Sequence, residues 1–318
     1  MTIEPLPGAN FGGLVRFSDS AAGIDAIEAA RDVLLDGFYK ARGLLVVPGM
    51  GAVTGQPDLL VRLSYLFGPE VENYHQTLTE KTKLHASVAE ILVVSSMAPS
   101  NQMPPSQPDP PKTAEGGFPV QFPQRRGWHT DQSFRRPPPD VALFYAVKPA
   151  PKGQGQTLYA DGIGAYESLP PDLKARADRL EGYHVTPGTG RSEAAVRARE
   201  EPRPLLPHQR SQRQPVVRIH PVTGQPALYL CEGGQMDWIE GPLVDMAPGP
   251  DGDGAALLYE LMSHFTQPRF TYTHDWDQGD MVIYDNRSVI HTATWFDADA
   301  HDRLMWRTTV AGNPGPAY

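Results

Sequence analysis

Residues 269–286 read RFTYTHDWDQGDMVIYDN, and this stretch decides the fold class. Two runs rich in β-branched and aromatic residues, 269–276 and 281–286, flank a turn that contains glycine at 278–280. Short runs of this composition on either side of such a turn predict a β-hairpin. Similar runs recur along the chain, so most of it is expected to be strand.

Further strands and three helices are predicted outside this stretch. Short strands joined by tight turns, with helices at the ends, favour a mainly β fold with flanking helices, of sandwich or jelly-roll type. The predicted strands are VALFYAV at 141–147, QTLYA at 156–160, and a second hairpin of PVVRIH at 215–220 with PALYLCE at 226–232. Apolar spacing predicts helices at 24–38, ended by Gly43, at 166–180, and after Asp253.

Proline sets the domain organisation. The chain has 33 prolines in 318 residues, and proline is excluded from helix interiors and central strands. Residues 98–126 are dense in proline, glycine and polar residues, and a second irregular stretch runs from 186 to about 214. No repeat or linker divides the chain. We therefore expect one domain over 1–318, with a lid-like, Pro-rich insertion at about 98–127.

Composition and charge exclude several classes of function. Hydrophobic residues make up 40% of the chain and charged residues 20%, as in a globular protein with a core. The formal net charge of −9 argues against a nucleic-acid partner. Cys231 is the only cysteine, which excludes an intrachain disulfide and a multi-cysteine zinc site. No signal peptide and no apolar run of about 18 residues is visible, so we expect no membrane partner and a cytoplasmic location.

Three residues are candidate metal ligands. His129 and Asp131 are separated by one residue, and positions i and i+2 of a strand point to the same face. A His-x-Asp pair alone is a weak signal. His291 follows the strand-like run MVIYDNRSVI and would supply the third ligand from a neighbouring strand. Two histidines and one carboxylate suit a non-haem Fe(II) oxygenase, whereas zinc on the same ligands would favour hydrolysis.

Two arginines follow the third candidate ligand. Arg303 and Arg307 lie four positions apart on a strand-like segment, so both can face the same way. A guanidinium binds a carboxylate through two parallel hydrogen bonds, which suits a dicarboxylate co-substrate beside the metal. The alternative is that either arginine pairs on the surface with a nearby aspartate, namely Asp297, Asp299 or Asp302.

Four motifs give a more specific indication. WHTDQSF at 128–134, QTLYADG at 156–162, GDMVIYDNRSVIH at 279–291 and RLMWRTTVAG at 303–312 occur in this order. Together they resemble the taurine dioxygenase / 2,4-D dioxygenase (TauD/TfdA) family of Fe(II)- and 2-oxoglutarate-dependent dioxygenases. Further matches are HPVTGQPALYL at 220–230 and HFTQPRF at 264–270, so the likeness runs from about Pro5 to about Gly312. The resemblance implies a double-stranded β-helix, or jelly roll.

The resemblance also implies a role for each candidate residue. Halogenating relatives carry a small residue in place of the carboxylate ligand, so an aspartate at that position disfavours halogenation. Relatives are commonly dimers or tetramers, which makes a homo-oligomer the expectation here. By matching motif, the iron ligands would be His129, Asp131 and His291, the 2-oxoglutarate-binding residues Thr157 and Arg303, and the residue for an anionic substrate group Arg307.

The expected reaction is oxidation of an unactivated C–H bond by O2, with release of succinate and CO2 from 2-oxoglutarate. Hydroxylation would be followed by cleavage where the carbon also bears oxygen, nitrogen or sulfur. Arg307, with Arg125 and Arg126 just before the metal motif, favours a small anionic substrate. Two alternatives stay open: oxidative tailoring of an amino acid or carboxylate, such as desaturation, and a zinc-dependent hydrolase that uses the same three ligands.

Overall fold

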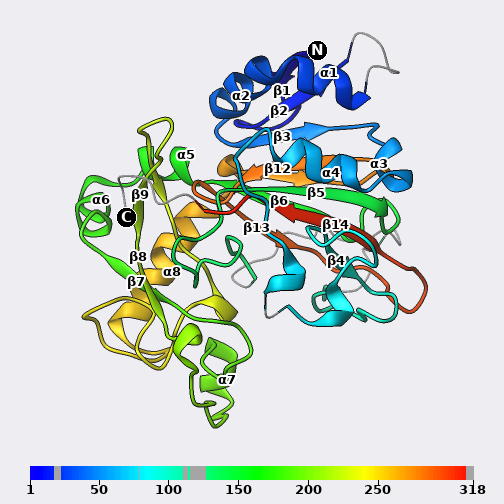
Figure 1. Cartoon of the computed structure of the whole chain (residues 1–318). Helices are drawn as coiled ribbons and strands as arrows, with labels where there is room; N and C mark the ends of the chain where they lie inside the picture. Colours follow the sequence, from blue (N-terminus) through cyan, green and yellow to red (C-terminus); the bar gives the residue numbers. More distant parts are fainter. Residues whose placement is uncertain (18–22, 78, 110–113, 115–126, 313–318) are drawn as a thin grey trace.

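The computed structural model describes residues 1–17, 23–77, 79–109, 114 and 127–312. Its largest element is a seven-stranded sheet, ordered β1-β2-β3-β12-β5-β14-β4 (Figure 1). Its strands pair antiparallel, apart from the parallel pair β2–β3. The strands are β1 (Thr2–Pro5), β2 (Gly13–Arg16), β3 (Leu44–Val47), β4 (Leu92–Ser95), β5 (Val141–Lys148), β12 (Met281–Asp285) and β14 (Leu304–Thr309).

A smaller antiparallel sheet packs against one face of the large one. It consists of β11 (Thr271–His274), β6 (Thr157–Asp161) and β13 (Val289–Ala293), with β6 in the middle. The rings of Tyr159 in β6 and Tyr284 in β12 have centroids 5.4 Å apart and share one buried cluster. The two sheets therefore form a sandwich with aromatic residues between them.

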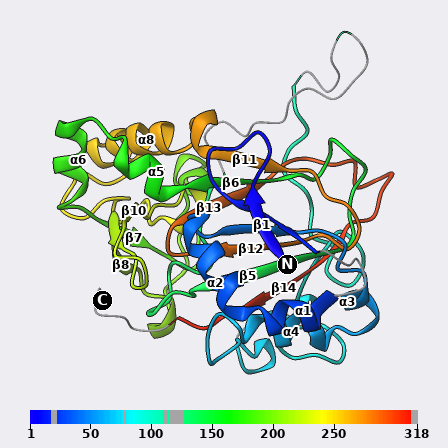
Figure 2. The ribbon, with the colours of Figure 1, turned by 90° about the horizontal axis from the view of Figure 1, so that it is seen from above.

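Helices cover both outer faces of this sandwich, as the layers in Figure 2 show. Ile283 of β12 packs in one buried cluster with Leu34 of α2, whereas the next residue back, Val282, faces the smaller sheet. On the opposite side, Leu158 of β6 packs in a cluster with Phe265 of α8. The helices are α1 (Gly23–Ala29), α2 (Arg31–Lys40), α3 (Ala52–Gly55), α4 (Asp58–Ser64), α5 (Gly162–Glu167), α6 (Pro171–Ala177), α7 (Glu193–Arg197) and α8 (Asp253–Phe265).

Two small hairpins and several short 3-10 helices complete the described chain. No helix in the described ranges is both long and apolar enough to cross a bilayer. The hairpins pair β7 (Glu181–His184) with β8 (Gln212–Pro215) and β9 (Val217–Ile219) with β10 (Pro226–Leu228). The 3-10 helices are η1 (Tyr74–Gln76), η2 (Lys81–Lys83), η3 (Pro207–Gln209), η4 (Gly233–Gln235) and η5 (Pro268–Phe270).

Most predicted elements are confirmed, and the sheet-rich fold with helices is as expected. The runs at 141–147 and 156–160 are β5 and β6, the second predicted hairpin is β9–β10, and the helix after Asp253 is α8. The helix expected at 24–38 is two helices, α1 and α2, and Gly43 follows with a φ of +80°. The helix expected at 166–180 is broken between α5 and α6, because Pro170 and Pro171 fit only the start of a helix.

The hairpin predicted at 269–286 is wrong. β11 pairs with β6 in the smaller sheet, while β12 pairs with β3 and β5 in the large one. All residues of β12 are buried, so this strand needs neighbours on both sides and layers on both faces. The turn at 278–280 therefore carries the chain from one sheet to the other, a choice that the local sequence does not encode.

The predicted insertion at 98–127 is only partly described. Residues 98–109, 114 and 127 are described and contain no helix or strand, as expected for a Pro-rich segment. Residues 110–113 and 115–126, which include Arg125 and Arg126, lie outside the described residues. The extent of the insertion as a lid, and the single domain over 1–318, stay predictions.

A buried ionic network fixes the turn between β12 and β13. The Arg287 guanidinium donates to both carboxylate oxygens of Asp285, at 2.7 and 2.6 Å, and lies 3.4 Å from Asp140. The His220 ring is within 2.9 Å of the same Asp285 carboxylate. Asp285 is fully buried and Arg287 nearly so. The network therefore fixes the turn that carries the chain from β12 of the large sheet to β13 of the smaller one.

Replacing Arg287 by methionine is therefore expected to destabilise the protein by about 3–5 kcal/mol, because it leaves a buried carboxylate short of its main partner. Urea unfolding followed by circular dichroism measures this loss. The matched control is Lys40→Met, which breaks the exposed Lys40–Asp36 pair and should leave the unfolding midpoint unchanged. Equal effects of both substitutions would contradict a structural role for the buried network.

Candidate metal centre and anion pocket

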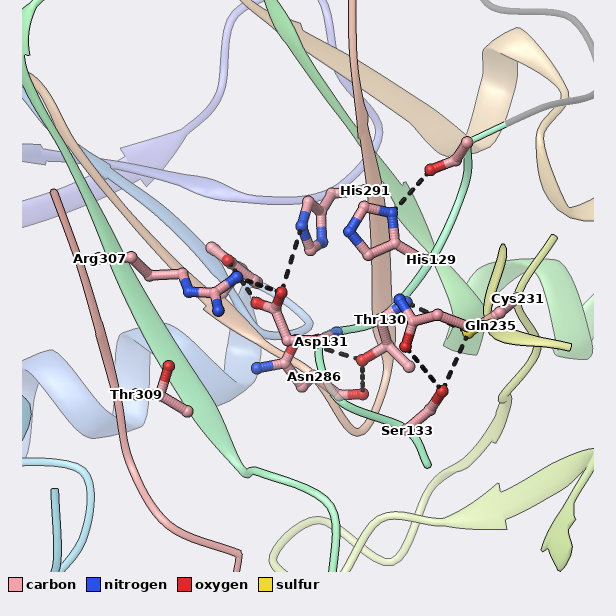
Figure 3. A network of polar contacts seen from close by, with 12 residues as sticks. His129, Thr130, Asp131, Ser133, Cys231, Gln235, Asn286, His291, Arg307 and Thr309 are labelled. Atoms are coloured by element: carbon pink, nitrogen blue, oxygen red, sulfur yellow. Dashed lines mark hydrogen bonds and ion pairs between the residues drawn. The ribbon is translucent and has the colours of Figure 1, made fainter. Parts of the chain in front are cut away.

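The structure brings His129, Asp131 and His291 together. One ligand atom from each lies within 4.8 Å of the others, with the histidine rings 4.4 Å apart (Figure 3). His129 forms an isolated antiparallel bridge with His291 in β13, through backbone hydrogen bonds of 2.9 and 2.7 Å. The strand expected for 129–131 is absent, because Asp131 opens a turn and Gln132 has a φ of +47°. The side chains nevertheless converge.

A hydrogen bond orients the imidazole of His129, whereas Nδ1 of the buried His291 makes none within the described residues. His129 Nδ1 is 2.7 Å from the carbonyl oxygen of Gly127, so it carries the proton and leaves Nε2 free as a ligand. His291 Nε2 lies 3.9 Å from Asp131 Oδ1. Burial, and next the adjacent His129, lower the pKa of His291 to about 3, so its imidazole is neutral at physiological pH. A neutral ring is the form that binds a metal.

Asp131 is buried and ionised. Burial alone would raise its pKa, but the adjacent Arg307 guanidinium, followed by the two neighbouring histidines, lowers it to about 2. Arg307 donates to Oδ1, and the Tyr284 hydroxyl donates to Oδ2 at 2.7 Å. Burial first, and then the nearby carboxylate, raise the pKa of Tyr284, which keeps it a donor. The donor set of two imidazoles and one carboxylate fits Fe(II) or Zn(II).

The predicted anion-binding residues line a pocket that opens onto the two histidines. Thr157, Arg303 and Arg307 all contribute to its wall. The side chain of Thr157 accepts a hydrogen bond from Trp276 Nε1 at 3.0 Å, so its own hydroxyl hydrogen can point to a ligand. The remaining wall residues include Phe144, Phe296 and, from the start of the Pro-rich segment, Gln102, Met103, Pro104 and Pro105.

Arg303 is a buried cation without a counter-ion. It is 7% exposed, its Nε makes no hydrogen bond, and no described carboxylate lies within ion-pairing distance. Burial lowers its pKa to about 10, with an opposing effect of Tyr159, so it remains charged at neutral pH. An uncompensated buried charge is costly, and an anionic ligand in the pocket would offset that cost.

Arg307 has a partner that the sequence did not suggest. The alternative of surface pairing with Asp297, Asp299 or Asp302 is wrong for both arginines, since Arg307 pairs with Asp131 and Asp302 pairs with Lys148. The sequence did not indicate Tyr284, which donates to the candidate ligand Asp131, or Trp276, which donates to Thr157. Both lie in strand-like runs where they are indistinguishable from ordinary core aromatics.

Comparison with known proteins gives a family match over almost the whole chain. A family model described as "Taurine catabolism dioxygenase TauD, TfdA family" matches residues 3–309. The alpha-ketoglutarate-dependent 2,4-dichlorophenoxyacetate dioxygenase of Burkholderia sp. (strain RASC) is 32% identical over 183 residues, which cover 58% of this chain and 57% of that enzyme. Pentalenolactone F synthase of Streptomyces arenae is 27% identical over 327 residues, covering 100% of this chain and 97% of that enzyme.

A solved structure shares the fold. The structure of AAD-2 in complex with Mn(II) and N-oxalylglycine superposes with a TM-score of 0.68 at 23% sequence identity, covering 99% of this chain and 98% of that one. At this identity the likeness concerns the fold alone. The chain thus matches one of the two relatives over its whole length, and the other over little more than half of that enzyme.

The three converging side chains predict one divalent-metal site. Mn(II) binding, followed by the loss of the free-ion signal in electron paramagnetic resonance, should be stoichiometric in the wild type and lost in His129→Ala and His291→Ala. The matched control is His274→Ala, which removes a buried histidine of β11 that bonds to Asp280 and not to any of the three candidate ligands. Retained binding in both ligand variants would place the metal elsewhere.

Proposed function

Because the chain belongs to the taurine catabolism dioxygenase TauD, TfdA family, we propose that it is an Fe(II)- and 2-oxoglutarate-dependent dioxygenase acting on a small anionic molecule. The family match confirms the resemblance seen in the sequence motifs. Enzymes named alpha-ketoglutarate-dependent dioxygenases use Fe(II), 2-oxoglutarate and O2. The proposed reaction oxidises an unactivated C–H bond of the substrate and releases succinate and CO2.

The observation that carries this proposal is the buried guanidinium of Arg303, which has no ion-pair partner within the described residues and lies in the same pocket as the two candidate histidine ligands. A dicarboxylate can place one end near the metal and the other at Arg303, with the hydroxyl of Thr157 as a second donor. In this proposal His129, Asp131 and His291 hold Fe(II), which supplies the activation of O2. The facing sheets are the two halves of a double-stranded β-helix.

The zinc-dependent hydrolase has less support than the dioxygenase. The three ligands suit zinc equally well, but hydrolysis gives Arg303 and Thr157 no role. Family membership and the naming of the relative as alpha-ketoglutarate-dependent both favour iron with 2-oxoglutarate. Asp131 occupies the carboxylate position, which also disfavours halogenation.

Arg307 supports an anionic substrate. Its guanidinium lines the pocket and is held beside the metal-ligand carboxylate, so a second anion at the same place would meet a cation already positioned. The Burkholderia relative acts, by its name, on a phenoxyacetate, which is a carboxylate. Hydroxylation followed by cleavage of a carbon–heteroatom bond is the proposed outcome for a substrate of that kind.

Oxidative tailoring is the second candidate, and the full-length similarity to pentalenolactone F synthase favours it. In that case the same residues would serve a desaturation or rearrangement of a carboxylate.

The start of the Pro-rich segment, Gln102–Pro105, lies in the pocket wall and supports the lid proposed for 98–127. A homo-oligomer, as dimer or tetramer, and a cytoplasmic location stay predictions.

Removing Arg303 should weaken 2-oxoglutarate binding. Hydrogen bonds to a charged group are worth about 1.5–3 kcal/mol, so the Kd for 2-oxoglutarate in Arg303→Ala should rise roughly 10- to 150-fold. The measurement is anaerobic titration of Fe(II) protein with 2-oxoglutarate, followed by the visible metal-to-ligand charge-transfer band. Arg213→Ala, an exposed pair partner of Glu181, is the control. An intact, iron-loaded wild type without a band would favour the hydrolase instead.

Removing the charge of Arg307 should change substrate choice. A panel of aryloxyacetates, alkyl sulfonates and alkyl sulfates, each with a neutral amide or ester of matched length, is tested for stimulation of succinate formation. The anionic members should stimulate the wild type, and in Arg307→Gln their KM should rise at least tenfold relative to the neutral partners. Equal KM ratios for both proteins would show that Arg307 does not bind the substrate anion.

A further inference from the structure

A side chain, rather than a neighbouring strand, holds the backbone of Asp131. In the described residues the only ladder contact of this segment is the bridge at His129, and Asp131 already lies in the turn that follows. Its backbone N–H donates to Asn286 Oδ1 at 3.1 Å. Asn286 therefore plays the part that a carbonyl oxygen of a neighbouring strand would play in a regular sheet.

Thr130 contacts the same asparagine. Its hydroxyl is fully buried and lies 2.7 Å from the backbone oxygen and 3.2 Å from Oδ1 of Asn286 (Figure 3). The single hydroxyl hydrogen is directed mainly to the nearer backbone oxygen, whereas Oδ1 accepts from the Asp131 N–H. Because the Asp131 N–H can only donate, it orients the Asn286 amide with its oxygen toward the 130–131 peptide, while the buried Nδ2 of Asn286 makes no hydrogen bond within the described residues.

Asn286 is itself held firmly. It is 1% exposed, and its backbone N–H donates to the Asp140 carbonyl oxygen at 2.8 Å. It stands in the turn that the buried Asp285–Arg287 pair fixes between the two sheets. The side chain therefore projects from a rigid support.

We infer that Asn286 and Thr130 are positioning residues that set the direction in which the Asp131 carboxylate leaves the backbone. Tyr284 holds Oδ2 and Arg307 donates to Oδ1, while the contacts from Asn286 and Thr130, here called the clamp, hold the backbone end. Oδ1 then lies 3.9 Å from His291 Nε2. A ligand side chain that is free to rotate loses conformational entropy when the metal binds. A side chain already held in the binding geometry loses less, so the metal binds more tightly. The inference rests on the proposed metal site and adds two residues to it.

The test measures Mn(II) affinity by electron paramagnetic resonance, together with the melting temperature of the metal-free protein. Loss of such a supporting contact typically costs about 10- to 100-fold in metal affinity, so this weakening is expected in Asn286→Ala and Thr130→Val. Thr130→Ser keeps the hydroxyl and should bind Mn(II) within about twofold of the wild type, since only a methyl group is lost.

The matched control is Ser133→Ala. Ser133 is as buried as Thr130, and its hydroxyl bonds to His184 at 2.8 Å and to Gln235 at 3.1 Å. It also lies 3.5 Å from Cys231 Sγ, which accepts from the Thr130 backbone N–H, but it makes no direct hydrogen bond to a candidate ligand, Thr130 or Asn286. It should lower the melting temperature as Thr130→Val does, with Mn(II) affinity unchanged. An equal loss of Mn(II) affinity in Ser133→Ala would show that the effect comes from disturbed packing and not from the clamp.

Two other outcomes separate the inference from the function it rests on. Wild-type affinity in both Asn286→Ala and Thr130→Val would overturn the clamp and leave the metal site standing. A wild type that binds no Mn(II) would overturn the metal site and the clamp with it. If Asn286→Ala does not fold, the pair Thr130→Val and Thr130→Ser decides the matter alone.

Discussion

Two backbone hydrogen bonds between His129 and His291 are the contact on which the site depends. They join the end of the Pro-rich segment to β13 of the smaller sheet and so place two imidazoles side by side. Tyr284, from the large sheet, meets Asp131 at the same place. The site therefore lies where three parts of the chain converge, and it exists only when the two sheets are correctly packed.

The two buried arginines of the pocket, Arg303 and Arg307, differ in whether a carboxylate balances their charge. Arg307 is compensated by Asp131, and the pair keeps this candidate ligand ionised. Arg303 has no such partner among the described residues, so the folded protein retains a charge whose burial is unfavourable. The buried charge of Arg303 lowers the stability of the folded protein, and a bound dicarboxylate would restore that stability. Such a local cost is characteristic of a functional site rather than of a structural one.

The sequence predicted the convergence of the three candidate ligands better than the backbone that carries them. His129, Asp131 and His291 converge as expected, although Asp131 lies in a turn and not on a strand. Local composition identified β12 as a strand but could not show that it leaves its apparent hairpin partner for the other sheet, since pairing depends on distant neighbours. Asn286 was likewise invisible as a support, because its contact with Asp131 exists only after the sheets pack.

We propose that one pocket binds a metal at His129, Asp131 and His291, and a dicarboxylate between that metal and Arg303. A crystal structure of the protein grown anaerobically with Mn(II) and 2-oxoglutarate tests it most directly. The account predicts a single metal bound by His129, Asp131 and His291, with the far carboxylate of 2-oxoglutarate paired with Arg303. A metal at other residues, or a carboxylate paired with Arg307 while Arg303 stays unpaired, would contradict it.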